Sequence, residues 1–173
     1  MPRGFRGRSA FYVQIWWLVQ GSLFRWSPQF AYRWRASLLR LFGAAVGNGT
    51  IIRQSVRITY PWKVKIGDNV WIGDRTELYS LGSITIGAST CISQDSYICT
   101  GTHDPCSRSF EIYSLPIEIG TEVWINSGVF VMPGTKIGSK SIIGVRSLVM
   151  SDIPEGVFAA GSPATVRGPH PGL

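Results

Sequence analysis

Aliphatic residues recur six positions apart along most of this chain, and this period constrains the fold more than any other feature of the sequence. The first run is Val46, Ile52, Ile58, Ile66, Ile72, Leu78, Ile86, Ile92 and Ile98, and the second is Ile119, Ile125, Val131, Ile137, Ile143 and Val149. An α-helix has a period of about 3.6 residues and an alternating strand a period of two, so neither produces this spacing. A short strand followed by a tight turn does produce it, with one side chain of each hexamer pointing inward.

Small residues stand at fixed places in each hexamer. Glycine directly follows the aliphatic residue at Gly47, Gly67, Gly73, Gly87, Gly120, Gly138 and Gly144. Four places after the aliphatic residue stand Thr50, Thr76, Thr90, Ser96, Thr135, Ser141 and Ser147. We expect the glycine to permit the backbone conformation of a corner, and the second small residue to avoid crowding there. Three hexamers then form one triangular coil, and stacked coils pair their strands in parallel around an aliphatic core.

Two steps of the first run are longer than six residues. The step from Ile58 to Ile66 and the step from Leu78 to Ile86 are eight residues each, which two extra residues at one corner of each coil explain. A sandwich of unrelated short strands is the alternative, but it gives no reason for the aliphatic residues to keep one register throughout. The sequence therefore favours the stacked coil.

The period stops between Ile98 and Ile119, where segment 100–116 reads TGTHDPCSRSFEIYSLP. Its glycine, prolines and polar residues indicate a loop that leaves the coil, and loops on a rigid scaffold often carry reactive residues. His103 lies near the start of this loop, whereas the other histidine, His170, lies in a Pro- and Gly-rich tail. Because imidazole titrates near neutral pH, His103 is the candidate general base for removing a proton from an attacking alcohol.

The sequence leaves open which group orients His103. Asp104 and Asp95 are the nearest acids, but either could form a turn or remain a solvated charge, and a backbone carbonyl would serve equally well. Cys99 and Cys106 flank His103, so a cysteine nucleophile is an alternative to direct transfer. Neither cysteine lies in a motif that would stabilise a thiolate, so direct transfer is the preferred reading.

Charge is distributed unevenly along the chain. Residues 1–67 contain 11 of the 17 basic residues and no acid, whereas residues 68–173 contain six basic and all ten acidic residues, a balance of 6 − 10 = −4. No nucleic-acid-binding motif accompanies the positive charge, so a nucleic-acid partner is not expected. Three cysteines without a CxxC pair, and no evident cleavable signal, indicate reduced thiols in the cytoplasm.

Many of the basic residues lie in an aromatic N-terminal segment that lacks the six-residue period. Ser27 and Pro28 are typical of an N-cap and the first residue of a helix, which is expected to run to about Leu41. Arginines interleave with apolar residues along it, at Arg33, Trp34, Arg35, Leu38, Leu39 and Arg40. This composition favours peripheral contact of residues 1–42 with a membrane. A cap on the open end of the coil, with solvated arginines, is an equal alternative, and the apolar stretch is too short to span a bilayer.

Several stretches resemble those of the hexapeptide-repeat acyltransferases, and in detail those of their colanic-acid-type polysaccharide O-acetyltransferases. These stretches are LFRWSP (23–28), ITYPW (58–62), IGDNVWIGD (66–74), ISQDSYICTGTHD (92–104) and GSPA (161–164). The resemblance implies a left-handed coil, a homotrimer with sites shared between subunits, and acetyl-CoA as co-substrate. It also implies direct transfer of acetyl to a sugar hydroxyl, with His103 as the general base.

The resemblance also assigns candidate binding residues. The CoA-contacting positions of the family fall here on Trp124, Ser127, Val145, Met150 and Ser151. Two positions depart from the family, because Ser151 replaces a common lysine and Thr165 replaces an arginine used for phosphate. The sugar-binding positions of the galactoside and maltose relatives fall on Gly73 and Leu81, which lack their polar groups. The nearby polar candidates for binding the acceptor are Asp74, Glu77 and Tyr79.

Together these observations predict an all-β fold, a left-handed parallel β-helix of hexapeptide repeats with an N-terminal helical segment. The helical segment is residues 1–43, and the acyltransferase domain is residues 44–173 with a catalytic loop at 100–116. The expected function is O-acetylation of a sugar hydroxyl in surface or exopolysaccharide synthesis, in the cytoplasm or at the inner face of the plasma membrane. The acceptor is lipid-linked, nucleotide-linked or free.

Other functions on the same fold are alternatives. They are an acetyltransferase for a small free acceptor (a sugar, an antibiotic or an amine) and a non-catalytic hexapeptide-repeat scaffold. A zinc-dependent carbonic anhydrase needs three histidines at each site, whereas the whole chain has two, so no metal is expected.

Overall fold

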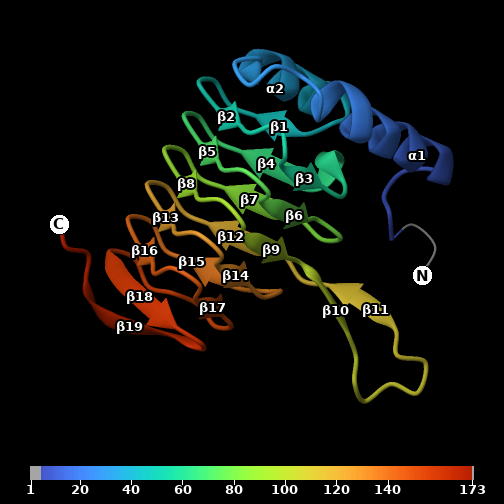
Figure 1. Cartoon of the computed structure of the whole chain (residues 1–173). Helices are drawn as coiled ribbons and strands as arrows, with labels where there is room; N and C mark the ends of the chain where they lie inside the picture. The colour runs from blue at the N-terminus through green and yellow to red at the C-terminus, as the bar shows by residue number, and fades with distance from the viewer. Residues whose placement is uncertain (1–4, 173) are drawn as a thin grey trace.

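The computed structural model describes residues 5–172 as a stack of triangular coils, with a helical head at one end and a hairpin projecting from one corner (Figure 1). Within these residues, the coil strands form three sheets, one on each side of the triangle. The first sheet contains β1 (Ala45–Val46), β4 (Val64–Ile66), β7 (Ile84–Ile86), β12 (Ile117–Ile119) and β15 (Lys136–Ile137). The second contains β2 (Ile51–Ile52), β5 (Trp71–Ile72), β8 (Cys91–Ile92), β13 (Trp124–Ile125), β16 (Ile142–Ile143), β18 (Val157–Gly161) and β19 (Ala164–Pro169). The third contains β3 (Arg57–Ile58), β6 (Glu77–Tyr79), β9 (Tyr97–Cys99), β14 (Phe130–Val131) and β17 (Leu148–Val149).

The predicted aliphatic ladder is confirmed. Every member from Ile52 to Val149 is buried, and Val46, at the open end of the coil, is half-buried. The strands of successive coils are parallel, so that each ladder residue stacks on its counterpart, as Ile66 does on Ile86. Because a narrow triangular core has few ways to repack, we expect each of these side chains to contribute about 2–5 kcal/mol to stability.

The glycines that follow the ladder residues are required for a different reason from the one expected. A Cβ added to Gly67 would lie 2.6 Å from the backbone nitrogen of Ala88 in the next coil, and one added to Gly120 would lie equally close to that of Ser139. Glycine is therefore needed because adjacent coils approach too closely for a side chain. The left-handed corner positions lie two residues later and are often not glycine: Asn69, Arg75, Ser89, Asp95, Glu122, Lys140 and Arg146. The expectation that these glycines supply the corner conformation is wrong.

The small residues of the corners are buried and hydrogen-bonded, which is more than the expected absence of crowding. The hydroxyl of Thr76 donates to the Ser93 carbonyl at 3.1 Å, and that of Thr90 to the Gly120 carbonyl at 2.8 Å. Both bonds join one coil to the next. At other corners valine fills the same inward position, as at Val56, Val70, Val123 and Val129.

Extra residues enter the coil at the corner between the third and first sheets. After β3 the chain forms a short 3-10 turn, Pro61–Lys63, and after β9 it leaves the coil as the antiparallel hairpin of β10 (Gly101–His103) and β11 (Ile112–Ser114). The predicted loop at 100–116 is thus a hairpin. Pairing of its two strands satisfies backbone groups that an irregular loop would leave to water.

The head consists of α1 (Ala10–Val19), a π-helical turn η1 (Gln20–Phe24) and α2 (Tyr32–Leu41). The second helix starts later than predicted, because Ser27 does not cap it. Its hydroxyl donates instead to the Phe24 carbonyl at 2.6 Å and accepts from Arg35 at 2.8 Å. None of the helices within residues 5–172 has the length and apolar content to cross a bilayer.

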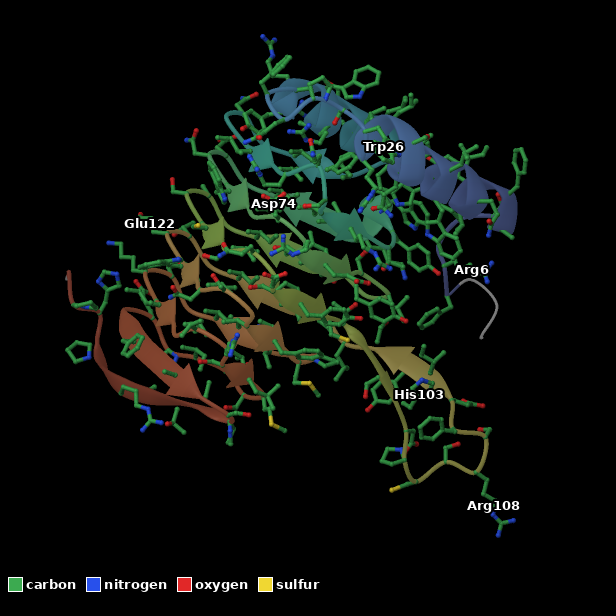
Figure 2. All side chains as sticks on the ribbon, in the orientation of Figure 1. Arg6, Trp26, Asp74, His103, Arg108 and Glu122 are labelled. Carbon is green, nitrogen blue, oxygen red and sulfur yellow. The ribbon has the colours of Figure 1, made fainter. Side chains whose placement is uncertain are left out.

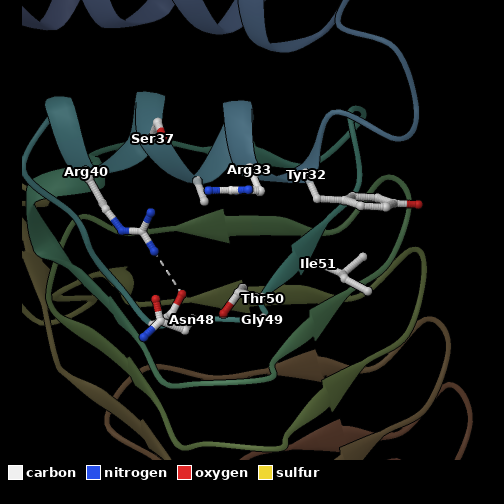
Figure 3. Close-up of a pocket in the computed structure, with 10 residues that line it drawn as sticks. Tyr32, Arg33, Ser37, Arg40, Asn48, Gly49, Thr50 and Ile51 are labelled. Atoms are coloured by element: carbon white, nitrogen blue, oxygen red, sulfur yellow. Dashed lines mark hydrogen bonds between the residues drawn. The ribbon is translucent and has the colours of Figure 1, made fainter.

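Two arginines of α2 cap the open end of the coil, as expected if the N-terminal segment is a cap. Arg35 is fully buried and donates to the Ile52 carbonyl at 2.6 Å. Arg40 donates to the carbonyls of Val46 and Gly47 at 2.9 Å, the second of which Figure 3 shows. They satisfy edge carbonyls that have no further coil to pair with. The expectation that these arginines are merely solvated is therefore wrong for both.

Head and coil share one hydrophobic core. Trp16, Phe24 and Leu39 of the head belong to the same buried cluster as Ile52 and Ile58 of the coil. Trp16 also donates its indole N–H to the Ile58 carbonyl at 2.8 Å. The change near residue 43 is therefore a change of secondary structure within one continuous core.

Candidate active site

His103 is the last residue of β10 and lies exposed on the projecting hairpin, which carries Arg108 near its tip (Figure 2). The hairpin register pairs Gly101 with Ser114 and His103 with Ile112. The single interruption predicted from the sequence thus holds the histidine on a paired strand outside the coil.

The imidazole of His103 is oriented by a backbone carbonyl. Its Nδ1 lies 2.9 Å from the carbonyl oxygen of Phe110, and its ring stacks on the Phe110 ring with centroids 4.4 Å apart and planes 8° apart. A carbonyl can only accept, so Nδ1 carries the proton and Nε2 keeps its lone pair. Phe110 itself has a φ of 45°, a left-handed backbone region that side chains rarely adopt. The hairpin therefore selects the tautomer in which Nε2 is the basic nitrogen.

The two acids considered as orienting groups are engaged elsewhere. Asp104 accepts from the backbone N–H of Cys106 at 2.9 Å, so it is a turn-former. Asp95 forms a two-point ion pair with Arg75, at 2.6 and 2.8 Å, which lowers the pKa of its carboxyl. Neither Asp104 nor Asp95 therefore bonds to His103, and the group that does is the backbone carbonyl of Phe110.

The cysteine next to the hairpin is a poor nucleophile. The Cys99 thiol donates to the Gly101 carbonyl at 3.3 Å, and burial raises its pKa, so little thiolate forms at neutral pH. Cys106 is exposed on the hairpin, and all three cysteines are free thiols. Direct attack by the acceptor fits this environment better than a thioester on Cys99.

Two of the three acceptor candidates lie together. Glu77 and Tyr79 of β6 line a cavity of about 300 Å³, whose other walls are Trp17, Gln20, Arg57, Ile58 and Thr59. Carboxylate, guanidinium, amide and aromatic groups in one small cavity are suited to the hydroxyls and apolar faces of a sugar ring. Neither Trp17 nor Gln20 was expected here, because only the folded head brings α1 against the third sheet.

Asp74 lies outside this cavity. Its carboxylate accepts from Arg53 at 2.8 Å and from the Ser55 hydroxyl at 2.6 Å. Burial acts to raise its pKa, but these two bonds outweigh burial and leave the pKa lowered. Asp74 therefore has a structural role in joining two coils, and its assignment to the acceptor is not supported by its contacts.

Tyr79 connects the cavity to the base of the histidine hairpin. Its carbonyl accepts from the Thr100 hydroxyl at 2.7 Å, and a Cβ on Gly101 would lie 2.9 Å from its ring. Residues two apart on a strand face the same side, so His103 faces the same side of the hairpin as Gly101. Burial raises the pKa of Tyr79, which keeps its hydroxyl protonated and able to donate.

The five CoA candidates all lie on the outside of the later coils. Ser127 and Val145 occupy the same corner of consecutive coils, where the N–H of Arg146 donates to the Ser127 carbonyl at 2.9 Å. Trp124 lies on the second sheet and donates to the Ser93 hydroxyl at 3.2 Å, while Met150 and Ser151 follow the third sheet. Trp124, Val145 and Met150 expose about half or more of their surface. Within residues 5–172, a single chain does not gather these five residues around one cavity.

Among the described residues, no three or more His, Cys, Asp or Glu side chains form a group that could hold a metal ion. A cavity of about 500 Å³ lies between α2 and the first coil, with Arg33, Arg40 and Asn48 in its walls (Figure 3). No residue of the hairpin lines it, so it is separate from the histidine site.

The chain is similar to known acetyltransferases in sequence and in fold. The chain is 54% identical over 166 residues to the Escherichia coli K12 protein assigned to colanic acid biosynthesis as the acetyltransferase WcaF, covering 96% of this chain and 91% of that protein. Among solved structures, a galactoside acetyltransferase in complex with coenzyme A has a TM-score of 0.85 at 29% identity, covering 98% of this chain and 84% of the other. A maltose O-acetyltransferase from Clostridium difficile 630 has a TM-score of 0.84 at 27% identity, with coverages of 93% and 89%. No protein-family model matches the chain.

Proposed function

This chain belongs to the hexapeptide-repeat acetyltransferases, which are left-handed parallel β-helices, and we propose that it acetylates a sugar hydroxyl in the synthesis of a surface polysaccharide. Acetyl-CoA is the donor, as the bound coenzyme of the galactoside acetyltransferase indicates. The 54% identity to a protein of colanic acid biosynthesis supports a polysaccharide precursor as the acceptor.

One observation carries the proposed mechanism, namely the bond between His103 Nδ1 and the Phe110 carbonyl. This bond leaves Nε2 free to take the proton of the acceptor hydroxyl as its oxygen attacks the thioester carbonyl. The C–S bond then breaks, and the imidazolium returns its proton to the departing thiolate. The products are the sugar ester and free CoA, and His103 ends neutral. No acyl-enzyme is needed in this sequence of steps.

The acceptor is proposed to bind in the cavity of Glu77 and Tyr79. Glu77 can accept hydrogen bonds from sugar hydroxyls, and the Tyr79 hydroxyl can donate one. The cavity borders the base of the hairpin through the contacts of Tyr79 with Thr100 and Gly101. Only part of each substrate site is present on one chain in this proposal.

A homotrimer is proposed because the five CoA candidates are spread over the second sheet, its corner with the third sheet and the end of the third sheet, so that one chain does not gather them around the histidine. Trp124, Val145 and Met150 are exposed apolar side chains on the later coils, and such surface is suited to a pantetheine chain and a neighbouring subunit. Ser127 and Ser151 add hydroxyls beside them. Packing of one subunit's later coils against the next subunit's hairpin would complete each site.

The proposed location is the inner face of the plasma membrane, with an acceptor that is linked to a lipid. The basic, aromatic composition of residues 1–42 supports this location.

The function is tested by incubating the purified chain and acetyl-CoA with lipid-linked, nucleotide-linked and free sugars, and by measuring acetylated product by mass spectrometry. We expect acetyl on a hydroxyl of a lipid-linked or nucleotide-linked saccharide. Acetylation confined to a small free sugar, an antibiotic or an amine would support the alternative and contradict the proposal.

A further inference from the structure

The outer face of the head exposes large apolar side chains. A protein that remains a monomer in water rarely exposes so many together, and such patches mark interaction sites. The most exposed are Phe11 (76%), Leu18 (72%), Trp26 (82%), Phe30 (82%) and Leu41 (73%).

These side chains occupy the side of the head that points away from the coil. On α1, Phe11, Ile15 and Leu18 are spaced by four and three residues and therefore share one helical face. Val13 and Trp16, on the opposite side of the same helix, are fully buried against the rest of the protein. The helix thus has one apolar face in the core and a second apolar face in solvent. Packing in the core accounts for the apolar residues of the first face only.

An apolar hollow continues this face between η1 and α2. Its volume is about 630 Å³, and the indole N–H of Trp34 donates to the Leu23 carbonyl at 3.1 Å across it. The residues that line it are Ser22, Leu23, Trp26, Ser27, Pro28, Ala31 and Trp34. A hollow of this kind is large enough to receive part of an acyl chain.

Free positive charge borders the same face. Arg25, which precedes Trp26 in the sequence, is exposed, and within residues 5–172 it forms no salt bridge. Arg33 is exposed too, but it lines the cavity between α2 and the first coil, and the guanidinium groups of Arg35 and Arg40 bond to coil carbonyls. Among the arginines from Arg25 to Arg40, the charge on this face is therefore that of Arg25.

We propose that this outer face binds the surface of an anionic lipid bilayer, with the aromatic side chains at headgroup depth and Arg25 on a lipid phosphate. Tryptophan with arginine on a helical surface is the composition of membrane-interface segments. The helices then lie in the plane of the interface. Figure 2 shows Trp26 on the head, at the end of the molecule away from the C-terminal coils.

A second copy joined head to head fits this face poorly, and the homotrimer proposed above uses the later coils and the hairpin instead. A two-fold contact would place the same surface on itself, so Arg25 would meet its own counterpart. The first acid in the sequence is Asp68, so the head offers no carboxylate to pair with it. A bilayer rich in anionic headgroups supplies both the negative charge and the apolar depth.

The orientation of the head on the bilayer indicates which acceptor is bound, and this conclusion rests on the proposed function. Trp17 and Gln20, from the same helical segment as Leu18, line the acceptor cavity. Trp17 also donates its indole N–H to the Thr59 carbonyl at 3.4 Å. Adjacent residues of one helix therefore contact the bilayer and the acceptor site, so the cavity opens beside the membrane surface. The acceptor that this arrangement selects is a sugar attached to a lipid.

Binding is tested with the full chain and vesicles of phosphatidylglycerol with phosphatidylcholine, by co-sedimentation. The double variant Trp26→Ser, Phe30→Ser is expected to lower the partition coefficient about tenfold or more, since it removes two exposed aromatic anchors. Trp71→Ser is its matched control, because Trp71 is a half-exposed tryptophan on the coil and should leave binding unchanged. Arg25→Glu is expected to lower binding about tenfold and to weaken the salt dependence, whereas Lys65→Glu, on the first sheet, should not.

Two outcomes contradict the proposal. Equal vesicle binding by the wild type and both head variants would show that this face does not bind the lipid surface. A fall in the sedimentation mass of the double variant with unchanged vesicle binding would identify the face as a protein interface instead.

The activity assay separates this inference from the proposed function. The double variant should keep its rate on a water-soluble saccharide acceptor and lose rate on the same saccharide carried by a lipid in vesicles. Equal rates of the double variant and the wild type on the lipid-carried acceptor would contradict the docking step. Absence of acetyl transfer to every saccharide, with vesicle binding intact, would instead contradict the proposed function alone.

Discussion

The carbonyl of Phe110 does for His103 what a carboxylate does in many hydrolytic triads, because it fixes which ring nitrogen carries the proton. It does so without adding a negative charge beside the ring. The stacked Phe110 ring covers one face of the imidazole. The base is therefore placed by the turn of one hairpin, and its chemistry depends on that turn's backbone.

Direct transfer predicts that no acetyl-enzyme accumulates. Incubation of the chain with acetyl-CoA alone, followed by intact-mass spectrometry, should show the unmodified mass, because burial raises the pKa of the Cys99 thiol and disfavours attack by sulfur. Cys99→Ser should retain turnover if it folds. A stable acetyl on Cys99 or Cys106 that is needed for turnover would establish a covalent route.

Thr76 tests whether the corner hydroxyls stabilise the stack. Its hydroxyl is buried and bonds to the Ser93 carbonyl, so Thr76→Val should lower the free energy of unfolding by about 1–3 kcal/mol, by leaving that carbonyl unpaired. The comparison is Thr85→Val on the exposed side of β7, expected to change it by less than about 0.5 kcal/mol. Equal effects at the two positions in denaturant unfolding would show that the hydroxyl is unimportant.

At this scale the sequence indicates a candidate base but not its partner. His103 stands out because it lies at the one long break of the period, which is a local signal. Its partner is a backbone carbonyl seven residues away, and no spacing rule identifies a carbonyl. Asp104 and Asp95 were candidates only because they are near in sequence, and both bond elsewhere.

The corner of each coil determines how closely the next coil stacks on it. Two positions of the corner, two residues apart, differ in whether they require glycine. Gly67→Ala should lower the free energy of unfolding by about 1–3 kcal/mol, because its Cβ would meet the backbone of Ala88 at 2.6 Å. Ser89→Gly should cost less than about 0.5 kcal/mol, since Ser89 already has a φ of 57° that glycine adopts without strain.

Thermal or denaturant unfolding of the two corner variants decides between the explanations. If Gly67→Ala were neutral and Ser89→Gly strongly destabilising, the close approach of the coils would not be what requires glycine. The period in the sequence marks the position of Gly67 but does not explain it, since close approach between coils is a property of the stack and not of one hexamer.

The elements themselves were largely predictable. The ladder residues define the strands because one inward side chain per hexamer leaves a single register for each coil. The helix start was missed because Ser27 and Pro28 have the composition of a cap, while tertiary contact with Arg35 uses the Ser27 hydroxyl instead. The hairpin of β10 and β11 was missed because its strands are short and rich in polar residues.

At the scale of the whole molecule, the head is part of the fold and not an attached module. Arg35→Met should lower the free energy of unfolding by about 3 kcal/mol or more, because it leaves the carbonyls of Ile52, Pro28 and Gln29 without their donor. Arg33→Met, on the exposed side of α2, should have an effect below about 0.5 kcal/mol. Similar unfolding curves for the two variants would mean that α2 does not cap the coil.

Because the head shares the core of the coil, its membrane binding is better tested by substitution than by truncation. Truncation before residue 44 would expose the core residues that Trp16, Phe24 and Leu39 cover, so loss of membrane binding in such a fragment could reflect loss of folding. Substitutions on the outer face, which leave those three residues in place, separate binding from stability.

The most direct test of the central claim measures acetyl transfer by His103→Ala in the full chain. Loss of the general base should lower turnover by about two to four orders of magnitude, while the unfolding transition stays that of the wild type. His170→Ala is the matched control and should retain wild-type turnover, since the His170 imidazole accepts from the backbone N–H of Gly172 in the C-terminal tail. Wild-type turnover by a folded His103→Ala variant would contradict the assignment of His103 as the base.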